Sequence, residues 1–382
     1  MNINNDRLKS LFTALKTYND TPGKGYTRRV FSETERSTLK WFEETLKSYG
    51  LYSHTDNVGN VFGKYGDGNY PILIGSHLDT VQNGGLYDGA LGVLGGLEVL
   101  ITLKENNVDV ERPIMLAAFR GEEANILGGT FGSRVFSKIF QSDLNDLDTV
   151  GLKEEDINAS HNQQDFHSYV ELHIEQGEVL ENEGLDIGVV TSIAGLRRYS
   201  IEVNGRSGHS GTTPMHLRND ALKLATEELQ NIFDMSENLD EQSVLTIGKL
   251  DMYPNQANVI PNKVKFLVEI RSDSEQKLDD YETQLLNRLS VSANRVVKKS
   301  TAKLDEEGIM KLCDVSQKLG YTYKKMVSGA NHDANAISTI MPASMLFIPS
   351  KDGVSHHPDE YSSEAQIKKG CNVLLNYILE RQ

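Results

Sequence analysis

Three apolar segments, each meeting a histidine or acidic residues at its end, constrain this chain more than any other feature. Short apolar runs of this kind predict buried strands of an α/β sheet. The segments and their polar residues are Ile72–Ile74 with His77 and Asp79, Pro113–Phe119 with Glu122 and Glu123, and Tyr169–Ile174 with His173. Because open α/β sheets bind ligands beyond the carboxyl ends of their strands, these polar residues mark a candidate site.

Asp88 adds a carboxylate to the first of these segments. It lies eleven residues after His77, just before a helix of small residues predicted over residues 90–104. An imidazole and a carboxylate on loops above one sheet suit a divalent metal ion with nitrogen and oxygen ligands. Taken alone, a pair such as His77 and Asp79 is more often a surface histidine beside an aspartate in a turn than part of a metal site. The residues at the other two strand ends are needed to distinguish these interpretations.

The length of the chain predicts two domains, since one core rarely serves 382 residues. Ser32, with Glu35 three residues later, is a predicted helix cap. In the first domain we expect helices over residues 4–18, 34–49 and 305–319, and strands over 58–64, 70–75, 113–119, 169–174 and 343–348, with a turn at 66–69. These elements predict the α/β fold class, with a central sheet flanked by helices.

The sequence pattern changes near Gly195. Strands alternating polar and apolar residues are predicted over 198–203, 244–250 and 264–271, with helices over 219–233 and 274–289. We therefore expect an inserted, smaller α+β domain at residues 194–303, interrupting a discontinuous catalytic domain at residues 1–193 and 304–382.

Charge and cysteine content argue against several classes of protein. The formal net charge is −15 and no long run of Lys or Arg occurs, which argues against binding nucleic acid. With 38% hydrophobic and 24% charged residues, the composition is typical of a globular protein rather than a disordered or membrane protein. The first ten residues lack an apolar signal-peptide core, and Cys313 and Cys371 lack metal-ligand spacing. We expect a cytoplasmic protein with reduced thiols.

With its histidines and acidic residues in this order, followed by the SHHP loop at 355–358, the chain resembles the di-metal amidohydrolases and peptidases of the M20 group. Within that group it is similar to the branch of N-carbamoyl-L-amino-acid hydrolase, β-ureidopropionase and allantoate amidohydrolase. The motifs that indicate this branch are HIEQG at 173–177, GHSGTTPM at 208–215 and ANVIP at 257–261. The resemblance runs from about residue 50 to the C-terminus.

The resemblance implies a di-metal aminopeptidase-like catalytic domain with a central mixed sheet, and an inserted dimerisation domain. It also implies two divalent ions, zinc first, with manganese, cobalt or nickel also compatible. Asp88 would bridge them, with His77 and His173 completing one site and Glu123 and His356 completing the other. His356 is preferred to His357 because the family's ligand directly follows Ser355. His332 and Asp333 would line the substrate pocket, although both remain alternative ligands.

The resemblance further assigns catalytic and substrate-binding roles. Glu122 would be the general base, and Asp79 would orient His77. His209, supplied to the neighbouring subunit, would stabilise the oxyanion. The substrate-binding residues would be Asn258 and Arg271 for the α-carboxylate, Gln176 for the ureido group, and Gly329 and Ala330 through their backbone. A solvated charge at a strand end is the alternative for Arg271.

These roles imply a cytoplasmic, homodimeric, metal-dependent amidohydrolase. Its substrate would be a small ureido acid, either an N-carbamoyl-L-amino acid or a relative such as allantoate. Hydrolysis of the ureido C–N bond would release the amino acid, carbon dioxide and ammonia. An M20 aminoacylase or dipeptidase is the alternative enzyme. A non-catalytic relative that binds a small acid is less favoured, because neither the base nor any ligand is missing.

Overall fold

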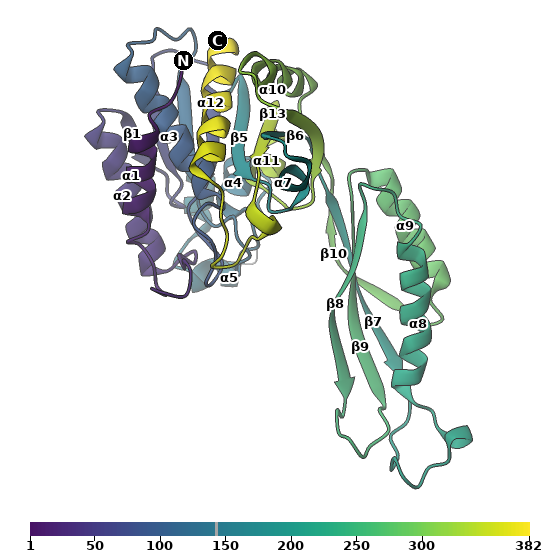
Figure 1. Ribbon diagram of the computed structural model, residues 1–382. Coiled ribbons are helices and arrows are strands. Elements are labelled where there is room, and N and C mark those ends of the chain that lie inside the picture. Colours follow the sequence, from purple (N-terminus) through teal and green to yellow (C-terminus); the bar gives the residue numbers. More distant parts are fainter. Residues whose placement is uncertain (142–143) are drawn as a thin grey trace. The chain divides into compact units, whose positions relative to one another are not determined.

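The computed structural model describes residues 1–141 and 144–382, which form two compact units (Figure 1). The larger unit comprises Met1–Thr191 and Lys303–Gln382, and the smaller unit comprises Ser192–Ala302. The chain therefore leaves the larger unit once and returns to it. Each unit has its own sheet.

The larger unit is built on one mixed sheet in the order β1-β2-β4-β3-β5-β13-β6-β11, with β12 paired to β6. The four central strands, β4, β3, β5 and β13, run parallel, whereas β2 and β6 are antiparallel to their central neighbours. The strands are β1 (Tyr52–Thr55), β2 (Val61–Tyr65), β3 (Ile72–His77), β4 (Ile114–Phe119), β5 (Ser168–Ile174), β6 (Ile187–Ile193), β11 (Ala302–Lys303), β12 (Tyr323–Ser328) and β13 (Ala343–Ile348). The predicted α/β class with a central mixed sheet is confirmed.

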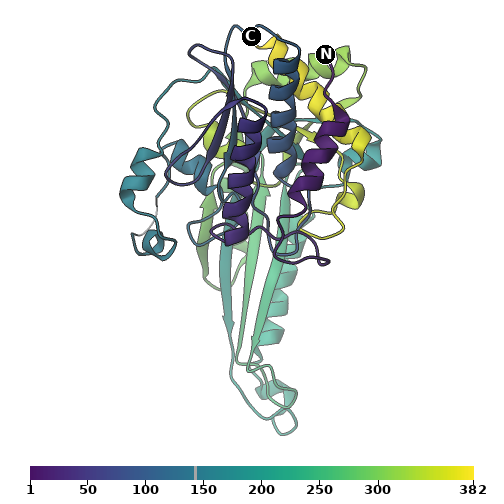
Figure 2. The same ribbon diagram turned by 90° about the vertical axis from the view of Figure 1, so that its left-hand side faces the viewer.

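Helices flank this sheet, and Figure 2 shows purple α1 and α2 on the same side as yellow α12. Helix α3 packs on β3, β4 and β5 and against α12, while α4 contacts β4 and α11. The helices are α1 (Asn5–Leu15), α2 (Glu33–Ser48), α3 (Ala90–Glu105), α4 (Phe131–Phe136), α5 (Leu144–Thr149), α6 (Glu154–Ala159), α7 (Val179–Glu183), α10 (Glu306–Lys318), α11 (Asp333–Ile337) and α12 (Glu364–Glu380), with a 3-10 turn, η2, at Lys351–Gly353.

The start of β2 shows how local polar contacts shift an element from its predicted bounds. A strand was predicted from residue 58, but β2 begins at Val61. The Asp56 carboxylate accepts hydrogen bonds from the backbone N–H groups of Val58, Gly59 and Asn60, and Gly59 has φ of +97°. An aspartate that binds successive backbone N–H groups holds the chain in a turn, so the strand starts only after Asn60.

The predicted turn at 66–69 connects β2 to β3, yet these strands are not neighbours. Strand β4 lies between them, antiparallel to β2 and parallel to β3. Helix α3 supplies the crossover that parallel β3 and β4 require. The predicted Ser32 cap is present, since its hydroxyl accepts from the Glu35 N–H. Other elements of the larger unit were not predicted, namely strands β1, β6, β11 and β12 and helices α4, α5, α6, α7, α11 and α12.

The smaller unit is a four-stranded antiparallel sheet, β10-β7-β9-β8, backed by two helices. Alternate residues of β9, from Val264 to Ile270, are buried in a core with residues of both helices. This period of two places Lys265, Leu267, Glu269 and Arg271 on the opposite face of β9. The elements are β7 (Gly195–Asn204), a 3-10 turn, η1, at Met215–Leu217, α8 (Ala221–Ser236), β8 (Val244–Tyr253), β9 (Lys263–Ser272), α9 (Glu275–Arg288) and β10 (Ala293–Lys299).

No helix within residues 1–141 and 144–382 combines the length and the apolar character needed to cross a membrane.

Close packing of α3 on the sheet gives the first testable prediction. A Cβ at Gly92 would lie 2.5 Å from the Leu172 carbonyl oxygen and 2.8 Å from the Ser76 Cβ. A Cβ at Gly96, in the same helix, would instead meet the Leu116 Cδ1 at 2.6 Å, and that methyl group can move. We expect Gly92→Ala to lower the free energy of unfolding by about 1–3 kcal/mol, despite the better helix propensity of alanine.

Gly96→Ala is the matched control, because the helix gains a similar amount of propensity in both variants. It should lower the free energy of unfolding by less than about 1 kcal/mol, since the Leu116 methyl group can move. Urea unfolding followed by the fluorescence of Trp41, the single tryptophan of the chain, reports on the larger unit. Equal free energies for the two variants would show that the backbone contact at Gly92 is not limiting.

Candidate metal centre

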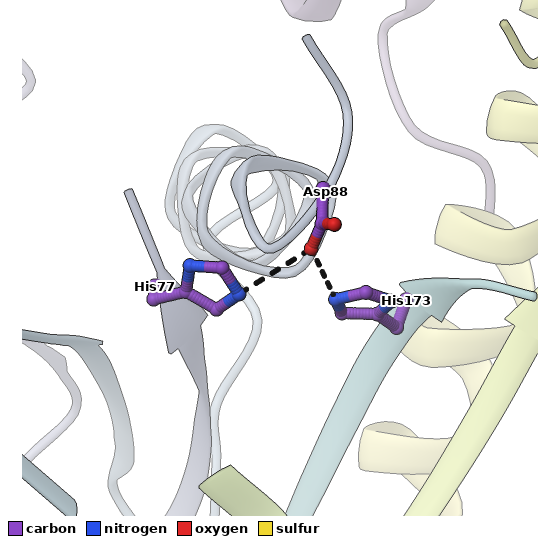
Figure 3. A group of neighbouring side chains, drawn as sticks. All are labelled: His77, Asp88 and His173. Atoms are coloured by element: carbon purple, nitrogen blue, oxygen red, sulfur yellow. Dashed lines mark ion pairs between the residues drawn. The ribbon is translucent and has the colours of Figure 1, made fainter. Parts of the chain in front are cut away.

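Asp88 is the centre of the candidate site, between two histidines from different strands (Figure 3). His77 is the last residue of β3, and its Nε2 lies 3.5 Å from the Asp88 Oδ1. His173 is on β5, and its Nε2 lies 3.2 Å from the same oxygen. All three residues are buried. Two strand ends and the turn before α3 therefore place three potential ligand atoms within 4.8 Å of one another.

The second oxygen of Asp88 faces another group. The His356 Nε2 lies 3.2 Å from the Asp88 Oδ2 and 3.4 Å from the Glu123 Oε1. These ligand atoms also lie within 4.8 Å of one another. Unlike the first group, this one contains an exposed member, because the His356 side chain is 50% exposed. Asp88 thus offers one oxygen to each group, as a bridging carboxylate does.

Backbone carbonyls set the tautomers of His77 and His173. The Nδ1 of His77 lies 3.0 Å from the carbonyl oxygen of Asp79, and the Nδ1 of His173 lies 2.8 Å from that of Ile174. Because a carbonyl oxygen only accepts, each Nδ1 must carry the proton and donate it. Each Nε2 is then the nitrogen available to a metal ion, and that of His173 accepts from the Gly89 N–H (3.0 Å).

Asp79 contacts His77 mainly through its backbone, while its carboxylate has another function. The Oδ1 of Asp79 accepts from the N–H groups of Gly121 (3.1 Å) and Glu122 (3.3 Å), and the Oδ2 accepts from that of Glu123 (3.1 Å). The Asp79 Oδ1 is 3.6 Å from the His77 Nδ1, beyond a good hydrogen bond. Asp79 therefore joins the loop after β3 to the loop that carries the glutamate pair.

The glutamate pair lies in a turn beyond β4, where Gly121 has φ of +70°. Glu122 reaches the first group, with its Oε2 3.7 Å from the His77 Nε2, whereas Glu123 belongs to the second group. Burial raises the pKa of Glu122 well above its usual range, and the charges of Glu123, Asp333 and Asp79 add to this effect. Burial and the charge of Asp88 raise the pKa of Glu123 to about 7. Both shifts show an excess of buried negative charge.

Asp88 behaves differently from the two glutamates. Burial raises its pKa, but the interactions of its carboxylate with His173, His356 and His77 outweigh burial and hold the pKa well below the usual range. Asp88 therefore stays ionised between the two groups. Nitrogen and oxygen atoms at this spacing, with an excess of negative charge, fit divalent ions such as zinc or manganese. Three protein ligands in each group leave coordination positions open, as in catalytic rather than structural sites.

Gln176 lies against the shared carboxylate. Its Nε2 donates to the Asp88 Oδ2 (2.8 Å) and to the Ser355 Oγ (3.0 Å). Its own Oε1 is buried without a hydrogen-bond partner. Gly329 and Ala330 follow β12, and the Ala330 carbonyl accepts from the Ser328 hydroxyl.

The two alternative histidines are placed outside both ligand groups of the described residues. The ring of His332 packs on His173, with ring centroids 4.6 Å apart, and its Nε2 lies 2.8 Å from the Ser328 Oγ. Burial holds the pKa of His332 well below its usual range, so this ring is neutral. The Nδ1 of His357 lies 3.6 Å from the carboxylate of Asp359, near the surface.

The three remaining predicted residues belong to the smaller unit. The loops of His209 and Asn258 adjoin, since the Ser210 N–H donates to the Asn258 carbonyl (3.0 Å) and His209 forms a β-bridge with Val259. Arg271 is on β9, and its Nε donates to the Glu269 Oε1 (2.6 Å). Glu269 also pairs with Arg198, on the neighbouring strand β7.

Sequence analysis missed Glu360, whose buried carboxylate accepts from the N–H groups of Tyr87 (2.8 Å) and Asp88 (3.1 Å). Ser355 was noted only as a neighbour of His356, although its hydroxyl lies 3.2 Å from the Asp88 Oδ2. An acid four residues after a ligand histidine, in a loop of mixed polarity, carries no distinguishing pattern. The contact becomes visible only when the loops are folded together.

Comparisons with known proteins show which proteins this chain is similar to. The model of the peptidase family M20/M25/M40 matches residues 73–380. An allantoate amidohydrolase of Bacillus subtilis is 34% identical, over 95% of this chain and 94% of its own length. An N-carbamoyl-L-amino acid amidohydrolase of Geobacillus stearothermophilus is 33% identical, over 98% of each. The crystal structure of a hydantoinase/carbamoylase family amidase from Burkholderia multivorans has a TM-score of 0.91 at 29% identity and covers 100% of this chain and 98% of its own.

Adjacent histidines allow a matched test of the second ligand group. We expect chelator-treated protein to bind two equivalents of Zn²⁺, and His356→Ala to weaken one of them at least about tenfold, by removal of an imidazole ligand. His357→Ala should bind both equivalents as the unchanged protein does. Calorimetric titration measures both quantities. The reverse pattern would assign the ligand to His357.

Proposed function

The chain belongs to the peptidase family M20/M25/M40 and is a hydrolase of C–N bonds, and from this premise we propose that it cleaves the ureido bond of an N-carbamoyl-L-amino acid or a related ureido acid such as allantoate. The arrangement around Asp88, with one oxygen towards each ligand group and Glu122 beside the first, is the observation that supports this reaction most directly. Full-length similarity to enzymes named for both substrates supports the substrate class.

We assign two divalent ions to the two groups, with zinc as the first choice and manganese, cobalt or nickel also compatible. His77 and His173 would hold one ion, Glu123 and His356 the other, and Asp88 both. When bound, two such ions lower the pKa of a water molecule and polarise the carbonyl that it attacks.

Glu122 is the proposed general base. It is next to His77 but outside both ligand groups, so its carboxylate can accept a proton from the attacking water. Water adds to the ureido carbonyl, and Glu122 then passes the proton to the nitrogen of the amino acid, which leaves as the amine. The other product, carbamic acid, decomposes into carbon dioxide and ammonia. Gln176, beside Asp88, is positioned to orient the ureido group through its amide, with backbone contacts from Gly329 and Ala330.

The smaller unit is proposed to recognise the substrate's α-carboxylate and to form a homodimer. Arg271 offers a guanidinium that pairs with a carboxylate through two hydrogen bonds, and Asn258 would add an amide. Strand β8 is an edge of its sheet and exposes Val244 and Leu250. Such an edge is suited to pairing with a second copy. His209 would then stabilise the oxyanion in the partner's site.

We place the protein in the cytoplasm, where thiols stay reduced, because Cys313 and Cys371 are both buried and unpaired. The substrate class is tested by ammonia release from N-carbamoyl-L-amino acids and allantoate, with N-acetyl amino acids as the comparison. An aminoacylase would instead release a carboxylic acid from the acetyl substrates without ammonia, and that outcome would overturn the ureido assignment.

Glu122→Gln keeps the shape of the side chain but removes the proton acceptor. We expect ammonia release to fall by about 10²- to 10⁴-fold, with zinc content unchanged. Glu123→Gln should instead lower the zinc content, because Glu123 belongs to a ligand group. Steady-state kinetics together with metal analysis separates the two effects, and the opposite pattern would exchange the two roles.

Sharing of the site between subunits has a separate test. We expect His209→Ala and Glu122→Gln proteins, each nearly inactive, to regain part of the activity when mixed and allowed to exchange subunits. A mixed dimer then contains one site with both residues intact only if His209 acts in its partner's site. Absence of recovery in a verified heterodimer would place His209 in the site of its own subunit or outside catalysis.

A further inference from the structure

We propose that Glu360 is a positioning residue that holds the loops of Asp88 and His356 together, so that the second metal ion can bind. This inference rests on the proposed function, since it assumes the two-metal centre. Glu360 itself belongs to neither ligand group of the described residues. Its role is therefore indirect, through the residues that it contacts.

One oxygen of Glu360 fixes the backbone at Asp88. The Oε1 accepts from the N–H groups of Tyr87 (2.8 Å) and Asp88 (3.1 Å), and the side chain is buried. The chain at Gly85 passes so close that a Cβ there would lie 2.0 Å from the Glu360 Cδ. Two successive N–H groups on one carboxylate oxygen restrict both the position and the direction of Asp88.

The other oxygen of Glu360 contacts the loop of His356. The Ser355 Oγ lies 3.3 Å from the Glu360 Oε2 and 3.2 Å from the Asp88 Oδ2. Since Gln176 donates to this hydroxyl, the single hydroxyl proton of Ser355 is available for one of the two carboxylates. Ser355 thus bridges the two carboxylates, one residue before the ligand.

His356 depends on such support more than the other histidines do. His77 and His173 are on buried strands, whereas His356 is half-exposed, lies in a loop and has φ of +54°. Residues other than glycine rarely adopt a positive φ, so surrounding contacts must maintain it. Loosening the loop should therefore weaken the second ligand group and leave His77 and His173 in place.

The positive charge of Arg28 acts on the buried carboxylate of Glu360. Arg28 is fully buried, donates from its Nε to the Leu78 carbonyl (2.8 Å), and interacts electrostatically with Asp79 and Glu360. A buried carboxylate is costly without hydrogen bonds or an opposite charge, and Glu360 has both. They offset the cost only in part, because burial and the charge of Asp88 still raise the pKa of Glu360 to about 7.

The test is calorimetric titration of the chelator-treated, full-length protein with Zn²⁺. We expect Glu360→Ala to bind the second equivalent about 10- to 100-fold more weakly, as is typical when a residue supporting a ligand is removed, and to weaken the first less, because His77 and His173 stay on their strands. Glu360→Gln should bind both nearly as tightly as the unchanged protein, because the amide oxygen can accept the same two N–H groups. Asp359→Ala, at the exposed neighbouring acid, is the control and should have no effect.

Gly85→Ala is a second test, to be used if Glu360→Ala does not fold. Its added methyl group would clash with the Glu360 carboxylate. Gly85 has an ordinary backbone conformation, so the added methyl group acts mainly by displacing Glu360, and the second equivalent should again be weakened. Normal binding by Glu360→Ala or, where that variant does not fold, by Gly85→Ala would overturn the proposal. Loss of binding of both Zn²⁺ equivalents would also overturn it. The same holds if Glu360→Gln weakens the second equivalent as much as Glu360→Ala does. Fewer than two equivalents in the unchanged protein would instead refute the two-metal centre itself.

Discussion

Concentration of negative charge around Asp88 is the constraint on which the rest of the site depends. Five acidic residues meet at this edge of the sheet, and the structure satisfies three of them in different ways. Asp79 accepts three backbone N–H groups, Glu360 accepts two, and Asp88 is held by three histidines. Among the described residues, Glu122 and Glu123 lack comparable donors. Burial raises the pKa of both, and together with the charge of Asp88 it also raises that of Glu360 to about 7. The two carboxylates without donors therefore lie where divalent cations would be bound.

The parallel strands explain how residues distant in sequence reach one point. In the sheet, His77 is level with Phe119 at the end of β4, just before the glutamate pair, and His173 is level with Phe347 near the end of β13. Carboxyl ends of parallel strands lie at the same edge, where open sheets bind ligands. Asp88 enters from the turn before α3, and His356 from the loop after β13. The register of β3, β4, β5 and β13 thus sets the spacing of the centre.

This dependence on register also explains what could be predicted from the sequence. Apolar runs before His77, Glu122 and around His173 mark strand ends, so the α/β class and the edge of the sheet that carries the site could be recognised. The ligand set, with Glu123 and His356, came from the resemblance to the M20 group. The position of β4 between β2 and β3 could not, because a short turn between two strands does not require them to pair. Glu360 was also hidden, since its contacts with the Tyr87 and Asp88 backbone join loops more than 270 residues apart. Hydrogen bonds to backbone groups leave little trace in side-chain patterns.

Glu269 gives a physical basis for substrate discrimination, if Arg271 binds the substrate as proposed. It pairs with both Arg198 and Arg271. A substrate carboxylate would therefore have to share Arg271 with Glu269. The Arg271 side chain is about one-third exposed, so solvent screens the pair and lowers the cost of rearrangement. A neutral amide would form no ion pair with Arg271, whereas an acid would gain a charge-assisted hydrogen bond. The preference for acids over amides would then equal the difference between the binding free energies of the two substrates at Arg271.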